Sequence, residues 1–211
     1  MEYVEFNRQT YETLADEYQQ RWKKFIDHQT EVLRPFTEEL VKKFGPNASA
    51  LDVGCGVGLD SYILSKCRLD VSGIDISSKM ISHAKINVPT GKFTVANFVD
   101  AKIDQIFDGV VMNAFIHLFP KTDCPEILKK AKAIMREGGI GFISTTKSDE
   151  SKEGYVEKDD YSGHMKRYRK HWTKKELEEA IVSAGFTIID TYENNDPVVS
   201  GKVWMNVMFH S

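Results

Sequence analysis

The stretch from Leu51 to Gly58, Leu-Asp-Val-Gly-Cys-Gly-Val-Gly, constrains the fold of this chain more than any other. An apolar run ends there in alternating glycines, and a helix-like pattern from Leu59 to Cys67 follows at once. This order predicts a buried strand, a tight turn and the start of a helix. Glycines lack a β-carbon, so the backbone of such a turn can bend sharply and lie against a ligand. The first N–H groups of the next helix point to the same place.

An acidic residue ends the next apolar stretch. Asp75 follows Val71–Ile74 and stands seventeen residues after Gly58. In an open α/β sheet, a carboxylate at this place can accept hydrogen bonds from both hydroxyls of a ribose. The glycine turn and Asp75 together predict a site for a ligand that contains a ribose.

The string Asp-x-Gly-x-Gly-x-Gly resembles motif I of the class I S-adenosylmethionine (SAM)-dependent methyltransferases, and the resemblance extends over Leu51–Phe186. The alternative is a dinucleotide-binding turn, which has glycines spaced Gly-x-Gly-x-x-Gly. Gly54 and Gly56 fit that spacing, but Leu59 stands in the third place and the extra glycine, Gly58, falls one residue early. The resemblance implies SAM as the cofactor and methyl transfer as the activity.

Strand-like and helix-like patterns alternate along the rest of the chain, which implies a parallel sheet with helices on both faces. The expected strands are 50–53, 71–75, 92–96, 107–113, 140–146, 186–190 and 203–209. Capping-box spacings at Asp123 and Thr173 predict two helix starts. The resemblance adds a Rossmann-like sheet of seven strands, mostly parallel, whose last strand is antiparallel.

The residues before the sheet, 2–44, are helical in pattern. An apolar stripe recurs at three- and four-residue steps, from Tyr11 through Tyr18 and Trp22 to Ile26. A second helix is expected to begin near Pro35, a favourable first-turn residue, and to stop at Gly45. We expect these helices to form a cap over the ligand end of the sheet.

Length and composition indicate a single domain. The 211 residues suffice for one domain with a large core, here divided into a helical cap (1–46), a SAM-binding core (47–146), an insertion on the substrate side (147–172) and closing elements (173–211). The net charge of −3 and the 41% apolar fraction make a nucleic-acid partner unlikely. Three scattered cysteines and the lack of a long apolar run indicate a cytoplasmic protein that does not enter a membrane. We expect this protein to be a monomer or a homodimer.

The resemblance implies which residues hold the cofactor. Asn97 departs from the acid that related enzymes often place there to bind adenine, but its amide oxygen can still accept from an exocyclic amine. A plain loop asparagine is the alternative. The expected cofactor contacts are Asp52, Gly54, Cys55, Gly56, Gly58, Asp75, Ile76, Met80, Asn97, Phe98, Asn113 and, from a Tyr-x-x-x-Ala-x-x-Tyr pattern, Tyr11.

The acceptor side is predicted from two segments. His117 follows the fourth core strand, and its near-neutral titration suits a general base, although a packing role is the alternative. Tyr18 is a second catalytic candidate and Trp22 a substrate contact, although an aromatic stripe at this spacing is also typical of a core. The long polar insertion is expected to act as a functional loop in which His164, Arg167 and Tyr168 bind an anionic or polar acceptor. A solvated lid with internally paired charges is the alternative.

The reaction we expect is transfer of a methyl group to an oxygen or nitrogen atom of a small molecule. A sulfonium is already a strong methyl donor, so positioning of the acceptor is the main requirement and no metal is needed. The alternatives are a non-catalytic SAM-binding module, a nucleotide-dependent oxidoreductase, and a methylase of protein or RNA. The last lacks support because Asn113-Ala114-Phe115-Ile116 stands where an Asn-Pro-Pro-Tyr motif would be.

Overall fold

Strands and helices alternate over most of the chain. The computed structural model describes residues 2–158 and 165–211. The helices are α1 (Glu2–Arg21), the 3₁₀ helix η1 (Trp22–Phe25), α2 (Ile26–Phe44), α3 (Leu59–Lys66), α4 (Ser78–Asn87), the 3₁₀ helices η2 (Ile116–Leu118) and η3 (Lys121–Asp123), α5 (Cys124–Ala133) and α6 (Lys174–Ser183). The strands are β1 (Ser49–Val53), β2 (Asp70–Asp75), β3 (Lys92–Val95), β4 (Phe107–Asn113), β5 (Met135–Thr146), β6 (Lys152–Lys158), β7 (Met165–His171), β8 (Thr187–Asn195) and β9 (Val203–His210).

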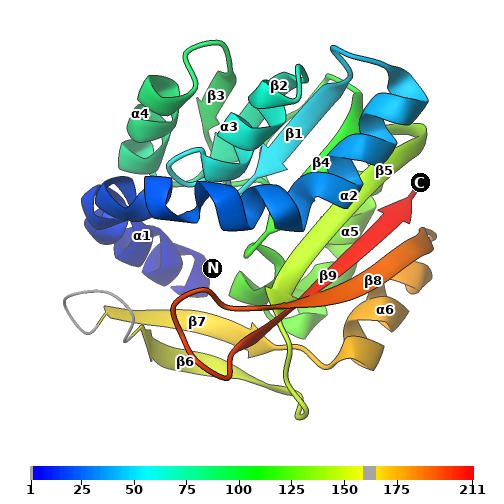
Figure 1. The fold of residues 1–211 in the computed structure, drawn as a ribbon. Helices are drawn as coiled ribbons and strands as arrows, with labels where there is room; N and C mark the ends of the chain where they lie inside the picture. Colours follow the sequence, from blue (N-terminus) through cyan, green and yellow to red (C-terminus); the bar gives the residue numbers. More distant parts are fainter. Residues whose placement is uncertain (1, 159–164) are drawn as a thin grey trace.

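Seven strands of the described residues form one sheet in the order β3-β2-β1-β4-β5-β9-β8 (Figure 1). The strands from β3 to β5 are parallel to their neighbours, whereas β9 is antiparallel to both β5 and β8. This confirms the predicted seven-stranded, mostly parallel sheet with an antiparallel last strand. The strand order reverses between β1 and β4, which is where open α/β sheets bind ligands.

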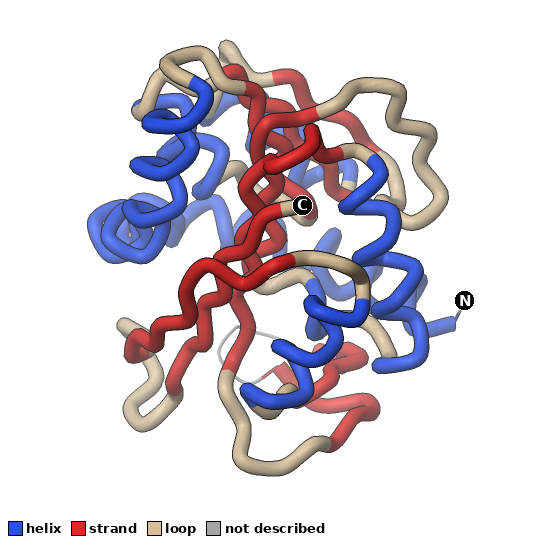
Figure 2. The backbone as a smooth tube through the Cα atoms, turned by 90° about the vertical axis from the view of Figure 1, so that its right-hand side faces the viewer, coloured by secondary structure: helices blue, strands red, loops and turns tan. Residues whose placement is uncertain are grey.

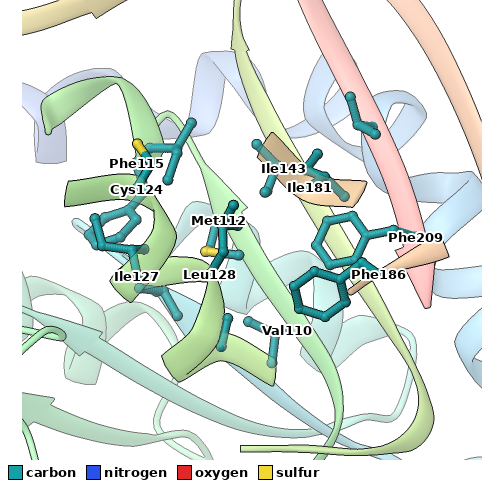
Figure 3. Packing of buried hydrophobic residues seen from close by; sticks show 14 of the residues in the cluster. Val110, Met112, Phe115, Cys124, Ile127, Leu128, Ile143, Ile181, Phe186 and Phe209 are labelled. Atoms are coloured by element: carbon teal, nitrogen blue, oxygen red, sulfur yellow. The ribbon is translucent and has the colours of Figure 1, made fainter. Parts of the chain in front are cut away.

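Helices cover both faces of the sheet (Figures 1 and 2). Alternate side chains of β4 point to opposite faces, as the period of a strand requires. Val111 joins a cluster with α2 and α3, whereas Val110 and Met112 join a second cluster with α5 and α6 (Figure 3). The seven-stranded sheet therefore lies at the centre of three layers, and the ends of its strands are left available for a site.

The sequence predicts that the second helix begins near Pro35. In the structure this helix begins at Ile26, and Pro35 lies inside it. A proline there costs one backbone hydrogen bond of the helix. The apolar stripe of α2 offsets that loss, because Leu33, Phe36 and Leu40 are fully buried against the sheet. The expected cap is thus α1, η1 and the first turns of α2, while the rest of α2 covers a face of the sheet.

Side-chain hydrogen bonds fasten α1 to α4. Glu12 accepts a hydrogen bond from Oγ of Ser77 (2.6 Å), and one turn further along, Asp16 lies 2.8 Å from Nε2 of His83. Ser77 also begins α4, since its Oγ accepts from the N–H of Met80 (3.1 Å). The cap helix is therefore held against an element that borders the cofactor end of the sheet.

The insertion between β5 and α6, which the sequence predicts to be a functional loop, contains the antiparallel pair β6 and β7. Tyr155 and Tyr168 lie opposite each other in this pair, with ring centroids 5.7 Å apart. Such cross-strand aromatic pairs stabilise a hairpin, and α1 packs along β7 through Asn7. The polar composition of β6 and β7 does not indicate a hairpin, because the buried contacts of this hairpin are made with α1.

The two predicted capping boxes differ. Oγ1 of Thr173 accepts from the N–H of Glu176 (3.2 Å) and begins α6 as expected. Asp123 makes no such bond, because η3 precedes α5 and the Asp123 carboxylate instead accepts a hydrogen bond from the Tyr3 hydroxyl. Asp123, the other predicted cap, therefore forms a contact between α1 and the start of α5.

Candidate active site

A cavity of about 310 Å³ lies at the carboxyl ends of the parallel strands. Gly54 after β1, Asp75 at the end of β2 and Asn113 at the end of β4 line one side of it. The cap and the turn between β8 and β9 line the other sides. The cavity thus spans the point at which the strand order reverses.

The backbone of β2 fixes the glycine turn after β1. The N–H groups of Gly54 and Cys55 both donate to the carbonyl oxygen of Ile74 (2.8 and 3.1 Å). Gly54 has a φ of +73°, and a β-carbon there would lie 2.7 Å from Cδ2 of Phe115. The turn therefore requires glycine, and the bare backbone of Gly54 and Gly56 forms part of the cavity wall.

Asp75 is oriented by the same turn. One carboxylate oxygen accepts from the N–H of Gly56 (2.9 Å) and the other from the N–H of Ser77 (2.8 Å). Burial raises the pKa of this carboxyl, and the backbone hydrogen bonds act in the opposite direction. Since a carboxylate offers about four lone-pair sites, both oxygens keep capacity for a ligand hydroxyl. The cradle of bare backbone and a fixed carboxylate fits a ligand that contains a ribose.

Three expected cofactor contacts lie behind the turn and are not part of the cavity wall. Asp52 accepts from the N–H and Oγ of Ser61 (3.0 and 2.6 Å), which joins β1 to α3. Cys55 packs in a cluster below the turn, and Gly58 allows α4 to approach, since its β-carbon would lie 3.2 Å from Ala84. These residues shape the turn, because motif spacing does not distinguish the ligand side of a turn from its core side.

Two buried acids stand side by side behind the turn. Burial raises the pKa of Asp60 to about 6, against the effect of the side chains of Asn113 and Gln29. Burial, followed by the charge of Asp60, raises the pKa of Asp52 well above its usual range. The carboxylates therefore oppose each other's ionisation.

The remaining cofactor candidates lie on the cavity wall: Ile76, Met80, Asn97, Phe98 and Asn113. The amide of Asn97 is held within its own loop, where Oδ1 accepts from the N–H of Val99 (3.2 Å) and Nδ2 donates to Asp100 (2.6 Å). Phe98 is buried and meets Phe115 edge to face, with ring centroids 5.9 Å apart. This end of the cavity offers apolar surface beside one oriented amide.

His117 lies on the cavity wall in η2 and is 1% exposed. Its Nδ1 is 3.1 Å from Oγ1 of Thr145 on β5, and its ring packs against Trp204 on β9 with centroids 6.3 Å apart. These contacts fix the imidazole in a polar corner of an otherwise largely apolar wall.

The aromatic residues of the cap divide between site and core. Tyr11 and Tyr18 line the cavity with ring centroids 6.0 Å apart. Trp22, expected as a substrate contact, is buried away from the cavity wall with its ring against Tyr62 (5.3 Å between centroids). The helical spacing identified the stripe but not which of its members face the ligand.

The hairpin supplies one expected acceptor contact to the wall and hides another. Arg167 lines the cavity and its Nη1 donates to the hydroxyl of Tyr11 (2.8 Å). Tyr168 faces away, between Tyr3 and Tyr155. His164 lies outside the described residues.

Sequence reasoning missed two parts of the wall. Arg169 follows Arg167 by two residues and lines the same cavity, which alternation along a strand would have indicated had the strand been identified. The turn between β8 and β9 contributes the larger part of the wall that was not predicted. Asp196-Pro197 marks a turn in the sequence, but nothing nearby indicates that it folds over the site. The missed residues at the cap and this turn are Arg21, Phe25, His28, Gln29, Asn194, Asp196, Pro197, Val198, Val199, Lys202 and Trp204.

The described residues lack the features of two other classes of site. Among residues 2–158 and 165–211, no three His, Cys, Asp or Glu side chains stand close enough together to hold a metal ion. No helix in the same residues has the length and apolar character needed to span a membrane.

A glycine turn with a fixed acid at the next strand end, in a sheet of this strand order, defines a class I SAM-dependent methyltransferase. The chain belongs to the methyltransferase domain family, whose model matches residues 25–191. The predicted family is thereby confirmed, and SAM is the cofactor of this class.

Individual relatives are more distant. The chain is 31% identical over 127 residues to a ubiquinone biosynthesis O-methyltransferase of Pelagibacter ubique, an alignment that covers 54% of this chain and 51% of the relative. The chain thus spans about half the length of the curated relatives it matches first.

Solved structures share the fold. The 1,6-didemethyltoxoflavin-N1-methyltransferase of Burkholderia thailandensis, with bound 1,6-didemethyltoxoflavin and S-adenosylhomocysteine, has a TM-score of 0.76 at 21% identity and covers 100% of this chain and 89% of its own. The magnesium protoporphyrin IX methyltransferase of Synechocystis with bound SAM has a TM-score of 0.66 at 15% identity, covering 86% and 79%. At these identities the likeness concerns the fold.

Proposed function

We propose that this protein transfers the methyl group of SAM to an oxygen or nitrogen atom of a small-molecule acceptor by direct in-line displacement. One observation carries the proposal: the glycine turn and Asp75 share one cavity with His117, Tyr18 and Arg167. A single cavity at the ends of the strands lets a donor and an acceptor meet. The similarity to a ubiquinone biosynthesis O-methyltransferase supports a small organic acceptor.

The residues at the cofactor end bind SAM and orient it. Bound SAM supplies a methyl group on a sulfonium, which needs no further activation and no metal ion. The bare backbone of Gly54 and Gly56 receives the amino-acid portion, and Asp75 accepts from the ribose hydroxyls. Tyr11 and Tyr18 close the cavity from the cap, where aromatic faces attract a cation by about 0.5–2 kcal/mol and exclude water.

The residues at the acceptor end position the attacking atom. Alignment of an acceptor with the sulfur–methyl bond can supply up to about 7–11 kcal/mol of the barrier. His117 is held by Thr145 in reach of the cavity and would take the proton of an acceptor hydroxyl. If the acceptor is a neutral amine, the proton leaves more easily and positioning alone suffices.

The test is transfer of a labelled methyl group from SAM to a library of small phenols, acids and amines, with SAM binding measured by calorimetry. We expect SAM to bind, at least one acceptor to be labelled, and Asp75→Ala to lose SAM affinity by 100-fold or more, since charged hydrogen bonds contribute about 1.5–3 kcal/mol each. Asp70→Ala is the matched control, because Asp70 lies on the same strand with an exposed carboxylate paired to Lys92. SAM binding without labelling of any acceptor would favour a binding module, and tight NADH binding would favour an oxidoreductase.

A further inference from the structure

A network of hydrogen-bonded polar side chains borders the cavity on the side away from the cofactor residues. Its members are Ser144 on β5, Asn206 on β9, Asn194 on β8 and His28 in the first turn of α2. In the sheet order, β5, β9 and β8 lie on the other side of β4 from β1 and β2, whose ends hold the glycine turn and Asp75 (Figure 1). Ser144, Asn194 and His28 line the cavity. The network therefore belongs to the acceptor side.

This network stands where an apolar cluster could continue. Phe142 and Met208 each lie two residues from a member of the network on the same strand, so they share its face of the sheet, and both belong to the cluster beneath α2. Asn206 is nonetheless fully buried. A buried amide costs free energy unless its hydrogen bonds are satisfied, whereas an apolar side chain would bring no such cost. A polar network at this place therefore points to a role other than packing.

The backbone fixes the direction of the hydrogen bond at Ser144. Nδ2 of Asn206 donates to the carbonyl oxygen of Tyr192 (3.3 Å) and to Oδ1 of Asn194 (2.7 Å). A backbone carbonyl can only accept, so the oxygen of the Asn206 amide faces Ser144, whose Oγ lies 2.8 Å away. The single hydroxyl proton of Ser144 is thus donated to Asn206. Only the lone pairs of Oγ remain for a ligand, so Ser144 can accept from a ligand but cannot donate to it.

The same reasoning fixes the proton of His28. Because Oδ1 of Asn194 accepts from Asn206, the NH₂ group of Asn194 faces the carbonyl oxygen of Asn195 (3.3 Å) and Nε2 of His28 (3.2 Å). An amide NH₂ group has no lone pair to offer, so Nε2 accepts and the ring proton lies on Nδ1. Among the described residues, Nδ1 has no hydrogen-bond partner, and His28 is half-buried on the cavity wall. This N–H group is the one left to donate to a ligand.

We infer that the acceptor binds beside this network through two hydrogen bonds of opposite direction. A carbonyl oxygen or ring nitrogen of the acceptor accepts from Nδ1–H of His28, and an O–H or N–H group of the acceptor donates to Oγ of Ser144. The inference rests on the proposed methyl transfer and adds the chemical class of the acceptor, a small molecule that carries an uncharged donor and an uncharged acceptor group. His28 and Ser144 determine specificity, and Asn194 and Asn206 are positioning residues.

The experiment measures binding to the protein loaded with S-adenosylhomocysteine, so that it does not depend on turnover. Each set of probes contains a molecule with both groups, one with the donor methylated and one without the carbonyl. The sets are oxindole, N-methyloxindole and indoline; 3-hydroxyacetophenone, 3-methoxyacetophenone and 3-ethylphenol; and the corresponding 4-substituted compounds. We expect the complete molecule of at least one set to bind ten-fold or more tightly than both others, because each incomplete molecule leaves a polar group of the site unpaired.

Two variants should separate the two hydrogen bonds. His28→Gln places a side-chain oxygen near the position of Nε2, where it can accept from Asn194, but it removes Nδ1–H. This variant should lose the preference over the carbonyl-free compound and keep the preference over the methylated one, whereas Ser144→Ala should show the reverse. If the network only fastens β8 to α2, both variants lower the affinities of all three molecules alike, and that result would overturn the inference.

Three controls separate this inference from failure of the fold or of the proposed function. His210→Gln, on β9 and outside the cavity wall, should change neither preference. The affinity for S-adenosylhomocysteine should change less than three-fold in the network variants, and a larger loss would overturn the inference because the network would then serve the cofactor. Nitrogen NMR of the original protein should place the ring proton of His28 on Nδ1, and with His28→Gln it decides the matter if Ser144→Ala does not fold. A proton on Nε2, or no preference in any set, would overturn the inference while leaving SAM binding and methyl transfer standing.

Discussion

The indole of Trp204 packs against the imidazole of His117, with ring centroids 6.3 Å apart and planes inclined by 53°. The indole is itself held, since its Nε1 donates to Asp196 (2.9 Å). The same carboxylate accepts from the N–H groups of Val198 and Val199 (2.9 Å each). A single acid at the turn between β8 and β9 therefore orders one wall of the acceptor side of the cavity.

Replacement of Asp196 by Ala should weaken acceptor binding without a change in cofactor binding. Burial opposes ionisation of this carboxyl, but hydrogen bonds from Lys202 and Trp204 hold its pKa below the usual range. Loss of these bonds costs about 1 kcal/mol each, so we expect the KM for the acceptor found by the labelling screen to rise five- to ten-fold. The affinity for S-adenosylhomocysteine, measured by calorimetry, should stay within two-fold. Asp190→Ala on β8 is the control, since Asp190 is exposed, and an unchanged KM in Asp196→Ala would contradict the prediction.

Substitution of Gly54 by Ala should damage both the fold and the site. The residue combines a positive φ with a β-carbon position 2.7 Å from Phe115, so the ring must move. Gly45→Ala separates the two effects, because Gly45 has a φ of +83° but open space around its β-carbon position. Urea unfolding should show a loss of about 1–2 kcal/mol for Gly45→Ala and about 1–3 kcal/mol more for Gly54→Ala. Only Gly54→Ala should weaken SAM binding, and equal losses in both variants would show that the close approach of Phe115 has no effect.

The centre of the sheet could be predicted from the sequence because β1, β2 and β4 are buried on both faces, whereas the edge strand β3 is largely exposed. Val110–Met112 is one such apolar run, and all residues of the strand Phe107–Asn113 except the last are buried. Pro35 and the hairpin of β6 and β7 could not be predicted in this way. Both depend on distant partners, since α2 is stabilised by the sheet below it and β7 by Asn7 of α1.

The geometry of the site could be predicted where a local motif sets it. Gly54, Gly56 and Asp75 meet at the cavity because a tight turn joins neighbouring strand ends. Trp22 and Tyr168 carry the right chemistry for an acceptor contact, but the rotation of their elements turns them into the core. Nothing near Trp204 in the sequence indicates that β9 presents it to His117, because that pairing results from the antiparallel last strand.

The contribution of Asp60 to the free energy of unfolding should fall as the pH rises from about 4 to about 6. The pKa of Asp60 is raised by burial from its ordinary value of 3.8 to about 6, so the folded protein binds a proton more tightly than the unfolded chain. Stability contributed by the protonated carboxyl is full below pH 4 and lost through pH 6, by at most about 3 kcal/mol. Asp60→Asn should flatten this slope in urea unfolding measured between pH 4 and 7. The exposed Asp104→Asn is the control, and the same slope in Asp60→Asn as in the original protein would contradict the assignment.

The last prediction concerns His117, whose role as a base has a structural alternative. His117→Gln keeps a polar side chain that can bond to Thr145 but removes the imidazole that would accept a proton. With a hydroxyl acceptor we expect kcat to fall about 10²–10⁴-fold while the affinity for S-adenosylhomocysteine stays within two-fold. The deficit should shrink as the pH rises, because an acceptor that ionises by itself no longer needs the base.

Thr145→Val gives the matched measurement for His117, since it leaves the imidazole in the cavity but removes the hydroxyl that lies 3.1 Å from Nδ1. If His117 is a base that must be oriented by Thr145, kcat should fall about ten-fold in Thr145→Val, which is less than the fall in His117→Gln. A purely structural histidine gives another pattern: kcat survives in His117→Gln, and both variants lower the free energy of unfolding by about 1–3 kcal/mol through the unpaired buried group. The pH dependence of kcat in the two variants, measured with one labelled acceptor, therefore separates a proton acceptor from a residue that only packs beneath Trp204.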